Sequence, residues 1–382
     1  MNKNYDVAIV GAGIVGLGAA LAAIRLGKKV VVIERSARAI GASIRNFGFV
    51  TVTGQCAGAH YQRALRSREI WADIAADAGA DIIHSGLIIP AYRDEAAQVI
   101  DAFLKTDMGQ SCSAISVEQA LKYVPVLKTD GIKTILYSPH ELRVESALVI
   151  PQLAKWLQEK HNVEFLWNTS VSAINGNNVE TNRGVISAET VIVCPGDDFS
   201  TLYPERIASH KLSICTLQML RVAPQKPFKQ NAAVMSDLSL ARYEGFTALP
   251  EAKALAKRLD EEESAKRNAG IHLIAVQSAD GSLVVGDSHV YGDSPQPFAS
   301  DYIDNMMLNA LDDVLDIPER KVIKRWTGDY AYSAQKTVLI DSPEPHIRLV
   351  MVTGGTGAST AFALGEEVLN ELYSNINKSK VV

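Results

Sequence analysis

Three glycines early in the chain are spaced so that a phosphate group could lie against the backbone. Gly11, Gly13 and Gly16 follow the apolar run DVAIV, and a helical pattern of small apolar residues begins directly behind them. Glycine permits a tight turn at the first position, close approach to a pyrophosphate at the second and close helix–strand packing at the third. The helix then points free N–H groups and its positive end at the phosphate. The spacing predicts the pyrophosphate site of a dinucleotide.

A carboxylate follows where the ribose of such a dinucleotide would lie. A second β-branched run, KKVVVIE, ends at Glu34, so that a complete strand–helix–strand unit surrounds the glycines. A carboxylate in this place accepts hydrogen bonds from ribose hydroxyls. Glu34 also disfavours NADP, because it would repel the 2′-phosphate.

A second glycine-rich turn near the C-terminus favours FAD over NAD. Residues 347–372 read as a strand, then Gly354, Gly355 and Gly357, then a long amphipathic helix. This turn offers a second helix N-terminus to an electron-rich group. NAD has no further electron-rich group that could bind at this second helix N-terminus, whereas a flavin has its pyrimidine carbonyl O2.

Five segments then carry a family resemblance over nearly the whole chain. VGAGIVGLGAA, GASIRNFGFV, VIVCPG, WTGDYAYS and VTGGTGAST, in this order, resemble the D-amino-acid oxidase, glycine oxidase and sarcosine oxidase family of FAD-dependent amine oxidoreductases. GASIRNFGFV, SDLSLARYEGF and VGDSHVYGDSPQPF resemble more narrowly a subgroup associated with phosphonate-degradation genes. For that subgroup the expected substrate is an aminophosphonate related to 2-aminoethylphosphonate, with or without a substituent or hydroxyl group.

The resemblance implies an α/β fold with two interleaved parts. We expect a Rossmann-type, glutathione-reductase-like FAD-binding domain from residues 1–80, 141–206 and 325–382. Residues 81–140 and 207–324 would form an α+β substrate-binding domain on a large mixed or antiparallel sheet. A chain of 382 residues is in any case long enough for two domains.

The FAD-binding residues implied by the resemblance extend the two glycine turns. Val171 would pair its backbone with the adenine, and Gly48 would let the backbone donate a hydrogen bond near the N5/O4 edge of the flavin. The expected set is Gly11, Gly13, Ile14, Val15, Gly16, Glu34, Arg35, Ala42, Ser43, Arg45, Asn46, Phe47, Gly48, Val171, Gly196, Gly354, Gly355, Thr356, Gly357, Ala358, Ser359 and Thr360. We expect FAD to be non-covalent, because no cysteine occurs from Trp326 onward, where some family members attach it.

The reaction implied is hydride transfer from the carbon beside an amine to flavin N5, followed by hydrolysis of the imine to an aldehyde. O2 is the expected acceptor. The cofactor carries the electron chemistry, so we nominate no catalytic side chain and expect no metal site. Three alternatives stay open: a glycine, sarcosine or D-amino-acid oxidase or dehydrogenase, a dehydrogenase that passes electrons to a quinone, and a non-catalytic FAD-binding scaffold.

The acid group of the substrate needs cationic or fork-shaped donors. Arg242 and His289 rank first, because each ends an apolar run read as a strand, AAVMSDLSLARY and SLVVGDSHVY. Lys336 and Arg45 are further cations, and Trp326 could wall the pocket. The candidate hydroxyl donors are Tyr243, Tyr291, Tyr330 and Thr356.

Composition excludes other classes of function. The net charge of −5 and the lack of a basic cluster argue against a nucleic-acid partner. The longest apolar region is broken by glycines and Arg25, so we expect no membrane span. The chain enters a strand at once, and we expect no leader. Four widely separated cysteines suggest structural thiols in the cytoplasm. The sequence predicts a small-molecule amine as partner and leaves the oligomeric state open.

Overall fold

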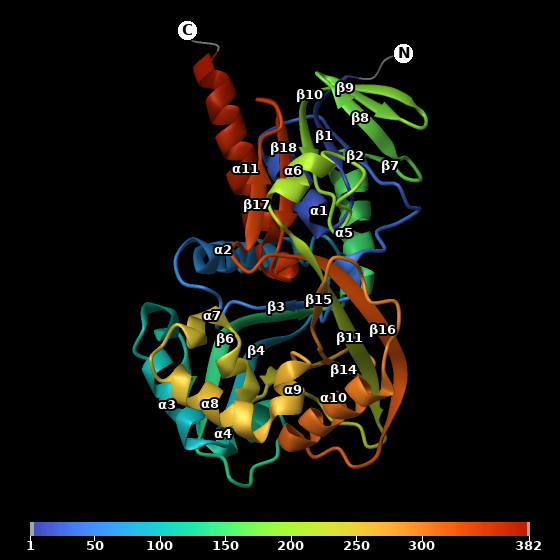
Figure 1. Ribbon diagram of the computed structural model, residues 1–382. Coiled ribbons are helices and arrows are strands. Elements are labelled where there is room, and N and C mark those ends of the chain that lie inside the picture. The colour runs from blue at the N-terminus through green and yellow to red at the C-terminus, as the bar shows by residue number, and fades with distance from the viewer. Residues whose placement is uncertain (1–3, 380–382) are drawn as a thin grey trace.

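Residues 4–379, which the computed structural model describes, are arranged around two β-sheets (Figure 1). The first sheet has eight strands, and β17, β18, β10, β1, β2 and β7 follow one another across it. The hairpin of β8 and β9 extends from β10. Their bounds are β1 (Asn4–Val10), β2 (Val30–Ile33), β7 (Glu164–Leu166), β8 (Val171–Asn175), β9 (Asn178–Thr181), β10 (Gly184–Val193), β17 (Val338–Asp341) and β18 (Ile347–Val352).

The centre of the first sheet is parallel and buried on both faces. β1 pairs in parallel with both β2 and β10. Along β1, Val7 and Ile9 belong to one apolar cluster, whereas Ala8 belongs to the cluster on the opposite face. The β-branched run of the sequence therefore forms a strand without an exposed side, as is typical of parallel sheets.

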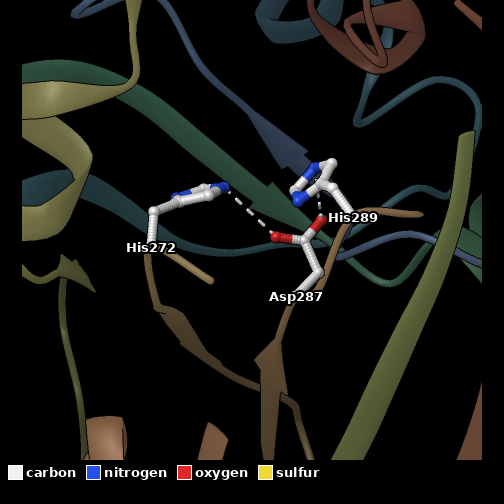
Figure 2. Close-up of side chains that lie close together, drawn as sticks. All are labelled: His272, Asp287 and His289. Carbon is white, nitrogen blue, oxygen red and sulfur yellow. Dashed lines mark ion pairs between the residues drawn. The ribbon is translucent and has the colours of Figure 1, made fainter. Parts of the chain in front are cut away.

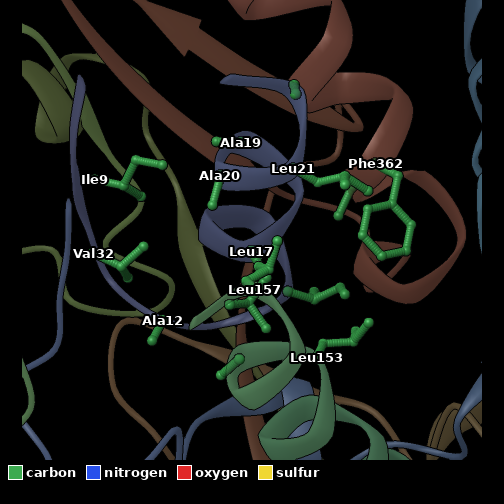
Figure 3. Packing of buried hydrophobic residues seen from close by; sticks show 14 of the residues in the cluster. Ile9, Ala12, Leu17, Ala19, Ala20, Leu21, Val32, Leu153, Leu157 and Phe362 are labelled. Carbon is green, nitrogen blue, oxygen red and sulfur yellow. The ribbon is translucent and has the colours of Figure 1, made fainter. Parts of the chain in front are cut away.

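Helices cover one face of this sheet at close range. α1 (Ile14–Arg25), α5 (Ser146–His161) and α11 (Gly357–Ser379) pack with the strands in one core, to which Leu17, Leu153 and Phe362 belong (Figure 3). Glycine lets α1 and α11 touch, since a Cβ on Gly18 would lie 2.5 Å from the carbonyl oxygen of Ala361. α2 (Ala59–Ile74) lies against α11, and the short α6 (Pro204–Ser209) follows β10.

The second sheet has ten strands and is mostly antiparallel. Its order is β15, β11, β14, β13, β12, β4, β6 and β3, with β16 paired to β11 and β5 paired to β6. Only the contact of β12 with β4 is parallel among the pairings described for this sheet. The bounds are β3 (Phe49–Val50), β4 (Ile82–Ala91), β5 (Ser113–Ala114), β6 (Thr134–Val144), β11 (Ser213–Pro224), β12 (Ala233–Met235), β13 (Ile274–Gln277), β14 (Leu283–Gly286), β15 (Val290–Gly292) and β16 (Arg320–Tyr332).

Helices cover both faces of the second sheet. Leu87 and Ile89 of β4 face a cluster with α3 (Asp94–Phe103), α7 (Glu244–Thr247) and α8 (Ala252–Glu262), whereas Ile88 faces α4 (Val117–Tyr123) and α10 (Asp301–Val314). The alternation along β4 explains why two helical layers can share one strand. The remaining short elements are α9 (Ser264–Asn268), η1 (Ala42–Ile44), η2 (Asp107–Gly109) and η3 (Asp237–Ala241).

Two local predictions are wrong. The run SLVVGDSHVY, read as one strand, forms β14 and β15 with Asp287, Ser288 and His289 in the break between them. The run AAVMSDLSLARY, read as a strand that ends at Arg242, forms only the short strand β12 and then the 3-10 helix η3. Ser236 and Ser239 cause the break, because their hydroxyls donate to the carbonyl oxygen of His272 at 2.8 and 2.9 Å and turn the chain away from the ladder.

The α/β fold with a large mixed sheet is confirmed. The proposed domain boundaries stay a prediction, and β6 and β16 each run across one of them. Within the described residues, no helix combines the length and apolarity that a membrane crossing requires.

Candidate active site

A cavity of about 610 Å³ reaches from the glycine turn after β1 to the second sheet. Both sheets contribute to its wall: Gly13, Glu34 and Gly355 lie in the connections after β1, β2 and β18 of the first, and Leu217, Ile274 and Tyr291 lie in strands of the second. We call the part of the cavity lined by Gly13, Glu34 and Gly355 the nucleotide end. The part lined by Leu217, Ile274 and Tyr291 is the substrate end.

The first glycine turn has the geometry that the sequence predicted. Gly11 has φ +104°, and a Cβ there would lie 2.4 Å from the carbonyl oxygen of Cys194. A Cβ on Gly16 would lie 1.9 Å from the carbonyl oxygen of Gly11, so this position must also be glycine. At Gly13 a built Cβ would have, among the described residues and apart from its chain neighbours, only Ser43 Oγ within 4 Å, at 3.0 Å. The backbone at Gly13 is therefore open toward the cavity that it lines.

Polar side chains hold the nucleotide end in shape. The Glu34 carboxylate accepts the backbone N–H of Ala12 at 3.0 Å and that of Ser36 at 2.9 Å. The N–H of Ile14, in the first turn of α1, donates to Ser43 Oγ at 2.9 Å. Glu34 thus holds the backbone of the glycine turn by these hydrogen bonds, and it also lines the cavity.

Removing the Glu34 carboxylate should weaken FAD binding. In Glu34→Ala we expect a loss of about 1.5–3 kcal/mol, roughly 10- to 150-fold in affinity, because hydrogen bonds to a charged oxygen disappear. Equilibrium binding of FAD to the deflavinated protein measures the change. Glu34→Gln, which keeps one acceptor oxygen, should lose less. Full FAD affinity in Glu34→Ala would show that the ribose site lies elsewhere.

The segment GASIRNFGFV runs along the cavity and is anchored by Asn46. The Asn46 amide nitrogen donates to the Ala42 carbonyl oxygen at 2.8 Å, and its amide oxygen accepts from Gly48 N and from Ser146 Oγ, both at 2.7 Å. Ala42, Ser43, Arg45, Asn46 and Phe47 line the cavity.

Gly48 differs from its predicted role. Its N–H is bonded to Asn46. A Cβ on Gly48 would lie 1.8 Å from the Val144 carbonyl oxygen, on β6. Glycine is therefore needed for close packing against β6, and Gly48 does not line the cavity.

The second glycine turn provides the test of whether a flavin fits. Gly355 has φ +72°, and the start of α11 lines the cavity with Thr356, Gly357, Ala358 and Ser359. Thr356 Oγ1 is buried without a hydrogen-bond partner among the described residues. Buried polar atoms rarely stay unpaired. An electron-rich ring edge at this helix N-terminus would supply the missing partner, so the residues fit the pyrimidine side of FAD.

Two contacts fix the start of α11 in place. Trp71 Nε1 donates to the Ala358 carbonyl oxygen at 2.8 Å, and the N–H of Thr51 donates to Ser359 Oγ at 2.8 Å. Thr360 turns away from the cavity and donates to the Thr356 carbonyl oxygen at 2.8 Å. Its predicted contact with the cofactor is therefore not through its side chain.

The remaining cofactor candidates lie farther along the nucleotide end. Val171 is buried in β8 and lines the cavity, as do Gly196 and Val15. Arg35 lines it too, and its guanidinium pairs with Asp198 at 2.6 Å. This ion pair lies in the wall of the nucleotide end, near the predicted position of the ribose.

The substrate end carries one arginine in contact with a tyrosine. Arg242 Nη2 donates to the Tyr291 hydroxyl at 3.1 Å, and both side chains line the cavity. Burial alone would lower the pKa of Arg242, but Tyr291 and Asp287 raise it, so the guanidinium stays charged. Tyr243 and Tyr330 line the same region.

Three residues that sequence reasoning did not combine meet beside Arg242. His272, Asp287 and His289 are all buried, line the cavity and face one another (Figure 2). Burial would raise the pKa of Asp287, but its neighbours, Arg242 among them, lower it to about 2. Burial lowers the pKa of His289 to about 3, against the opposing effect of Asp287. His289 is thus a neutral ring and not the cation that the sequence suggested.

Local structure explains how the three come together. β13 and β14 form an antiparallel pair in which Ile274 lies opposite Gly286. His272 precedes the first strand by two residues, and Asp287 follows the second directly, so both lie at the same end of the hairpin. The spacing Asp-x-His after a strand was the available signal, but its partner lies 15 residues earlier in the sequence.

Trp326 and Lys336 do not line the cavity. Trp326 Nε1 donates to the Arg45 carbonyl oxygen at 2.9 Å, so the indole buttresses the segment beside the cofactor. The Lys336 side chain is exposed, and its carbonyl oxygen accepts from Thr353 Oγ1. The sequence also missed several lining residues, namely Phe49, Thr51, Gln55, Cys56, His60, Leu217, Ile274 and Asp329.

A family model described as DAO, FAD dependent oxidoreductase, matches residues 6–370. Curated proteins give no significant match.

Solved structures share the fold over almost the whole chain. Glycine oxidase from Geobacillus kaustophilus has a TM-score of 0.75 at 17% identity, and the match covers 98% of this chain and 95% of that one. L-α-Glycerophosphate oxidase from Mycoplasma pneumoniae, a structure with FAD bound, has a TM-score of 0.70 at 16% identity and covers 97% and 95%. Iminodiacetate oxidase from Chelativorans sp. has a TM-score of 0.68 at 17% identity and covers 94% and 93%.

Proposed function

The chain belongs to the DAO family of FAD-dependent oxidoreductases, and from this premise we propose that it oxidises a small amine that carries an acid group. We further propose that the acid is a phosphonate and that the substrate is related to 2-aminoethylphosphonate. The observation that carries the proposal is the Arg242–Tyr291 pair at the substrate end of a cavity whose other end is built for a nucleotide.

The side chains of the substrate end would bind and orient the substrate. The Arg242 guanidinium would pair with the acid group, and the Tyr291 hydroxyl, held by Arg242, would donate its hydrogen to a second oxygen. With its acid group bound at this end, the substrate would point its amine and the neighbouring C–H bond toward Gly355 and Arg45, where the flavin fits. FAD, when bound, supplies the two-electron acceptor for that C–H bond.

The chain would keep the reacting region dry. Leu217, Ile274 and Phe47 give the cavity apolar wall on the side of the second sheet. Charged pairing is stronger when water is excluded, so an acid group held by Arg242 is fixed in orientation. Water would hydrolyse the imine product to an aldehyde and ammonia or an amine. We propose that O2 is the final electron acceptor. We also propose that the protein is located in the cytoplasm.

A carboxylate substrate is the second candidate, and a specific observation favours it. Arg242 is one charged donor, and one arginine satisfies a carboxylate, whereas a phosphonate with about −1.5 to −2 charges by analogy with phosphate wants more. Glycine oxidase and iminodiacetate oxidase are among the structures with this fold. A phosphonate therefore needs a second cation beside Arg242.

FAD should be released when the protein is denatured. Cys56 and Cys194 line the cavity. A hydrogen bond with Glu244 and burial raise the pKa of Cys56, and burial raises that of Cys194 to about 12, so neither is a thiolate at neutral pH. The thiolate is the nucleophilic form. Flavin should appear in the supernatant after acid precipitation, and flavin retained on the polypeptide would contradict non-covalent binding.

Product analysis tests the proposed function. The FAD-loaded protein, incubated in air with 2-aminoethylphosphonate, its N-methyl derivative, glycine or sarcosine, should consume O2 and form an aldehyde with the phosphonates. Aldehyde formation only from glycine and sarcosine would replace the phosphonate by a carboxylate. If none of the four amines reacts, the proposal as a whole fails.

A further inference from the structure

A cluster of two imidazoles and one carboxylate lies in the wall of the substrate end. His272 Nε2 is 3.2 Å from Asp287 Oδ1, and His289 Nε2 is 3.6 Å from Asp287 Oδ2 (Figure 2). The three ligand atoms all lie within 4.8 Å of one another. We call these residues the His–Asp–His cluster.

Hydrogen bonds behind the cluster decide which ring nitrogens face inward. His289 Nδ1 lies 2.9 Å from the Gly270 carbonyl oxygen, which can only accept, so the ring hydrogen is on Nδ1. His272 Nδ1 lies 3.3 Å from Ser239 Oγ, whose own hydrogen goes to the His272 carbonyl oxygen. Both rings can therefore hold their hydrogen on Nδ1 and turn the Nε2 lone pair toward Asp287.

This arrangement places three electron-pair donors against one another. Asp287 Oδ1 is buried and accepts no hydrogen bond of good geometry from the described residues, and His272 Nε2, the atom it meets at 3.2 Å, carries no hydrogen in this tautomer. A buried carboxylate oxygen without a hydrogen bond is costly. A cation between the three groups would satisfy all of them, and the outer hydrogen bonds of the rings match those that orient histidines at metal centres.

We propose that His272, Asp287 and His289 bind one divalent transition-metal ion, such as Zn²⁺, through two Nε2 atoms and a carboxylate oxygen. A tetrahedral zinc site holds its ligand atoms about 3.4 Å apart. His272 Nε2 and His289 Nε2 lie 3.2 and 3.6 Å from the two different oxygens of Asp287, and one ligand atom from each residue lies within 4.8 Å of the others, so small side-chain movements would bring the three groups onto one ion. Imidazole nitrogen suits zinc, iron, nickel or copper, whereas magnesium and calcium prefer oxygen alone.

Three protein ligands leave at least one coordination position open. All three residues line the cavity next to Arg242 and Tyr291, so the open position would face the place where the acid group lies. An oxygen of a phosphonate would bind there, and the metal would act as a second cation without any redox step. This role rests on the proposed function, whereas metal binding itself does not.

Zinc binding is measured on the untagged, FAD-loaded protein after dialysis against EDTA. Titration calorimetry and elemental analysis should give roughly one zinc ion per chain. Asp287→Asn and His289→Gln should lose this ion and keep their FAD absorbance, which reports that the fold is intact. His60→Gln is the matched control, because His60 is buried in the same cavity but contacts Gln55 at 3.2 Å. It should still bind one zinc ion.

Several results would overturn the proposal. If the wild-type protein binds no zinc, the proposal fails whatever the variants do. It also fails if Asp287→Asn and His289→Gln bind zinc as the wild-type protein does. Loss of zinc in His60→Gln to the same extent as in Asp287→Asn would also contradict it, because the effect would then not belong to the cluster.

A second titration tests the role of the metal. Methylphosphonate has no amine to oxidise and should bind the zinc-loaded protein at least 10-fold more tightly than the EDTA-treated protein. Equal affinity would remove the metal from substrate binding. Zinc bound at the cluster together with no amine oxidation would leave the metal site standing and refute the proposed function, so the two failures are distinguishable.

Discussion

Arg242→Gln should lower kcat/KM for 2-aminoethylphosphonate by about 2–4 kcal/mol, or roughly 30- to 700-fold. The guanidinium is the charged group of the Arg242–Tyr291 pair, and its substitution removes from a half-buried site the side-chain cation that would pair with the acid group of the substrate. Steady-state kinetics with O2 consumption as the readout measure the loss.

Two controls separate substrate recognition from damage to the fold. An uncharged amine of similar length should lose much less, since no anion is then left unpaired. Arg221→Gln alters a half-buried arginine of β11, in the second sheet, that lies outside the cavity and donates to Ser282 Oγ at 2.6 Å. It should not distinguish charged from uncharged amines. Equal losses on both amines in Arg242→Gln would assign Arg242 to the fold.

Gly13→Val should abolish FAD binding at ordinary concentrations, with a loss of about 3 kcal/mol or roughly 150-fold. Gly13 has φ −70° and ψ 176°, which valine adopts without strain. Apart from its chain neighbours, a Cβ would meet only Ser43 Oγ within 4 Å among the described residues, at 3.0 Å, a tight contact that a small shift of the Ser43 side chain relieves. The protein should therefore fold, while the added methyl groups fill the space that the pyrophosphate needs.

FAD content after purification and the far-ultraviolet circular dichroism spectrum check this result together. Gly13→Ala should show a smaller loss of FAD. Gly292→Ala, in β15, is the control, because its Cβ would make ordinary contacts at 3.5 Å or more and Gly292 does not line the cavity. Normal FAD content in Gly13→Val would mean that the pyrophosphate does not lie at this turn.

The nucleotide end could be predicted from the sequence because its determinants are local. Gly11 and Gly16 must be glycine for reasons that lie within one strand–turn–helix unit, where the built Cβ atoms would come within 2.4 and 1.9 Å of backbone oxygens. The strands around them are continuous apolar runs, as buried parallel strands require. These local rules hold whatever the rest of the chain does.

The substrate end could not be predicted in the same way, because its residues meet only through tertiary structure. The His–Asp–His cluster depends on the register of β13 and β14, which the sequence does not reveal. Arg242 lines the cavity as predicted, but it follows the 3-10 helix η3 and does not end a strand, so the structural reason given for the prediction is wrong.

Side-chain direction explains the other misplaced residues. Trp326 lies on the same face of β16 as Tyr330, yet the Arg45 backbone covers it and takes its hydrogen bond. Lys336 follows the end of β16 in a connection whose exposure only the folded chain defines. Gly48 was correctly seen as a site of close approach, but the approaching group is β6.

Anaerobic loss of FAD absorbance near 450 nm is the most direct measurement of the central claim, that this protein oxidises an amine whose acid group is held by Arg242. The FAD-loaded protein is mixed without O2 with 2-aminoethylphosphonate, its N-methyl derivative, glycine and sarcosine in turn, and the Arg242→Gln variant is treated identically. We expect the phosphonates to bleach the wild-type protein fastest and the variant to respond roughly 30- to 700-fold more slowly at low substrate concentration. FAD that no amine bleaches, or that bleaches at the same rate in wild type and Arg242→Gln, would contradict the account.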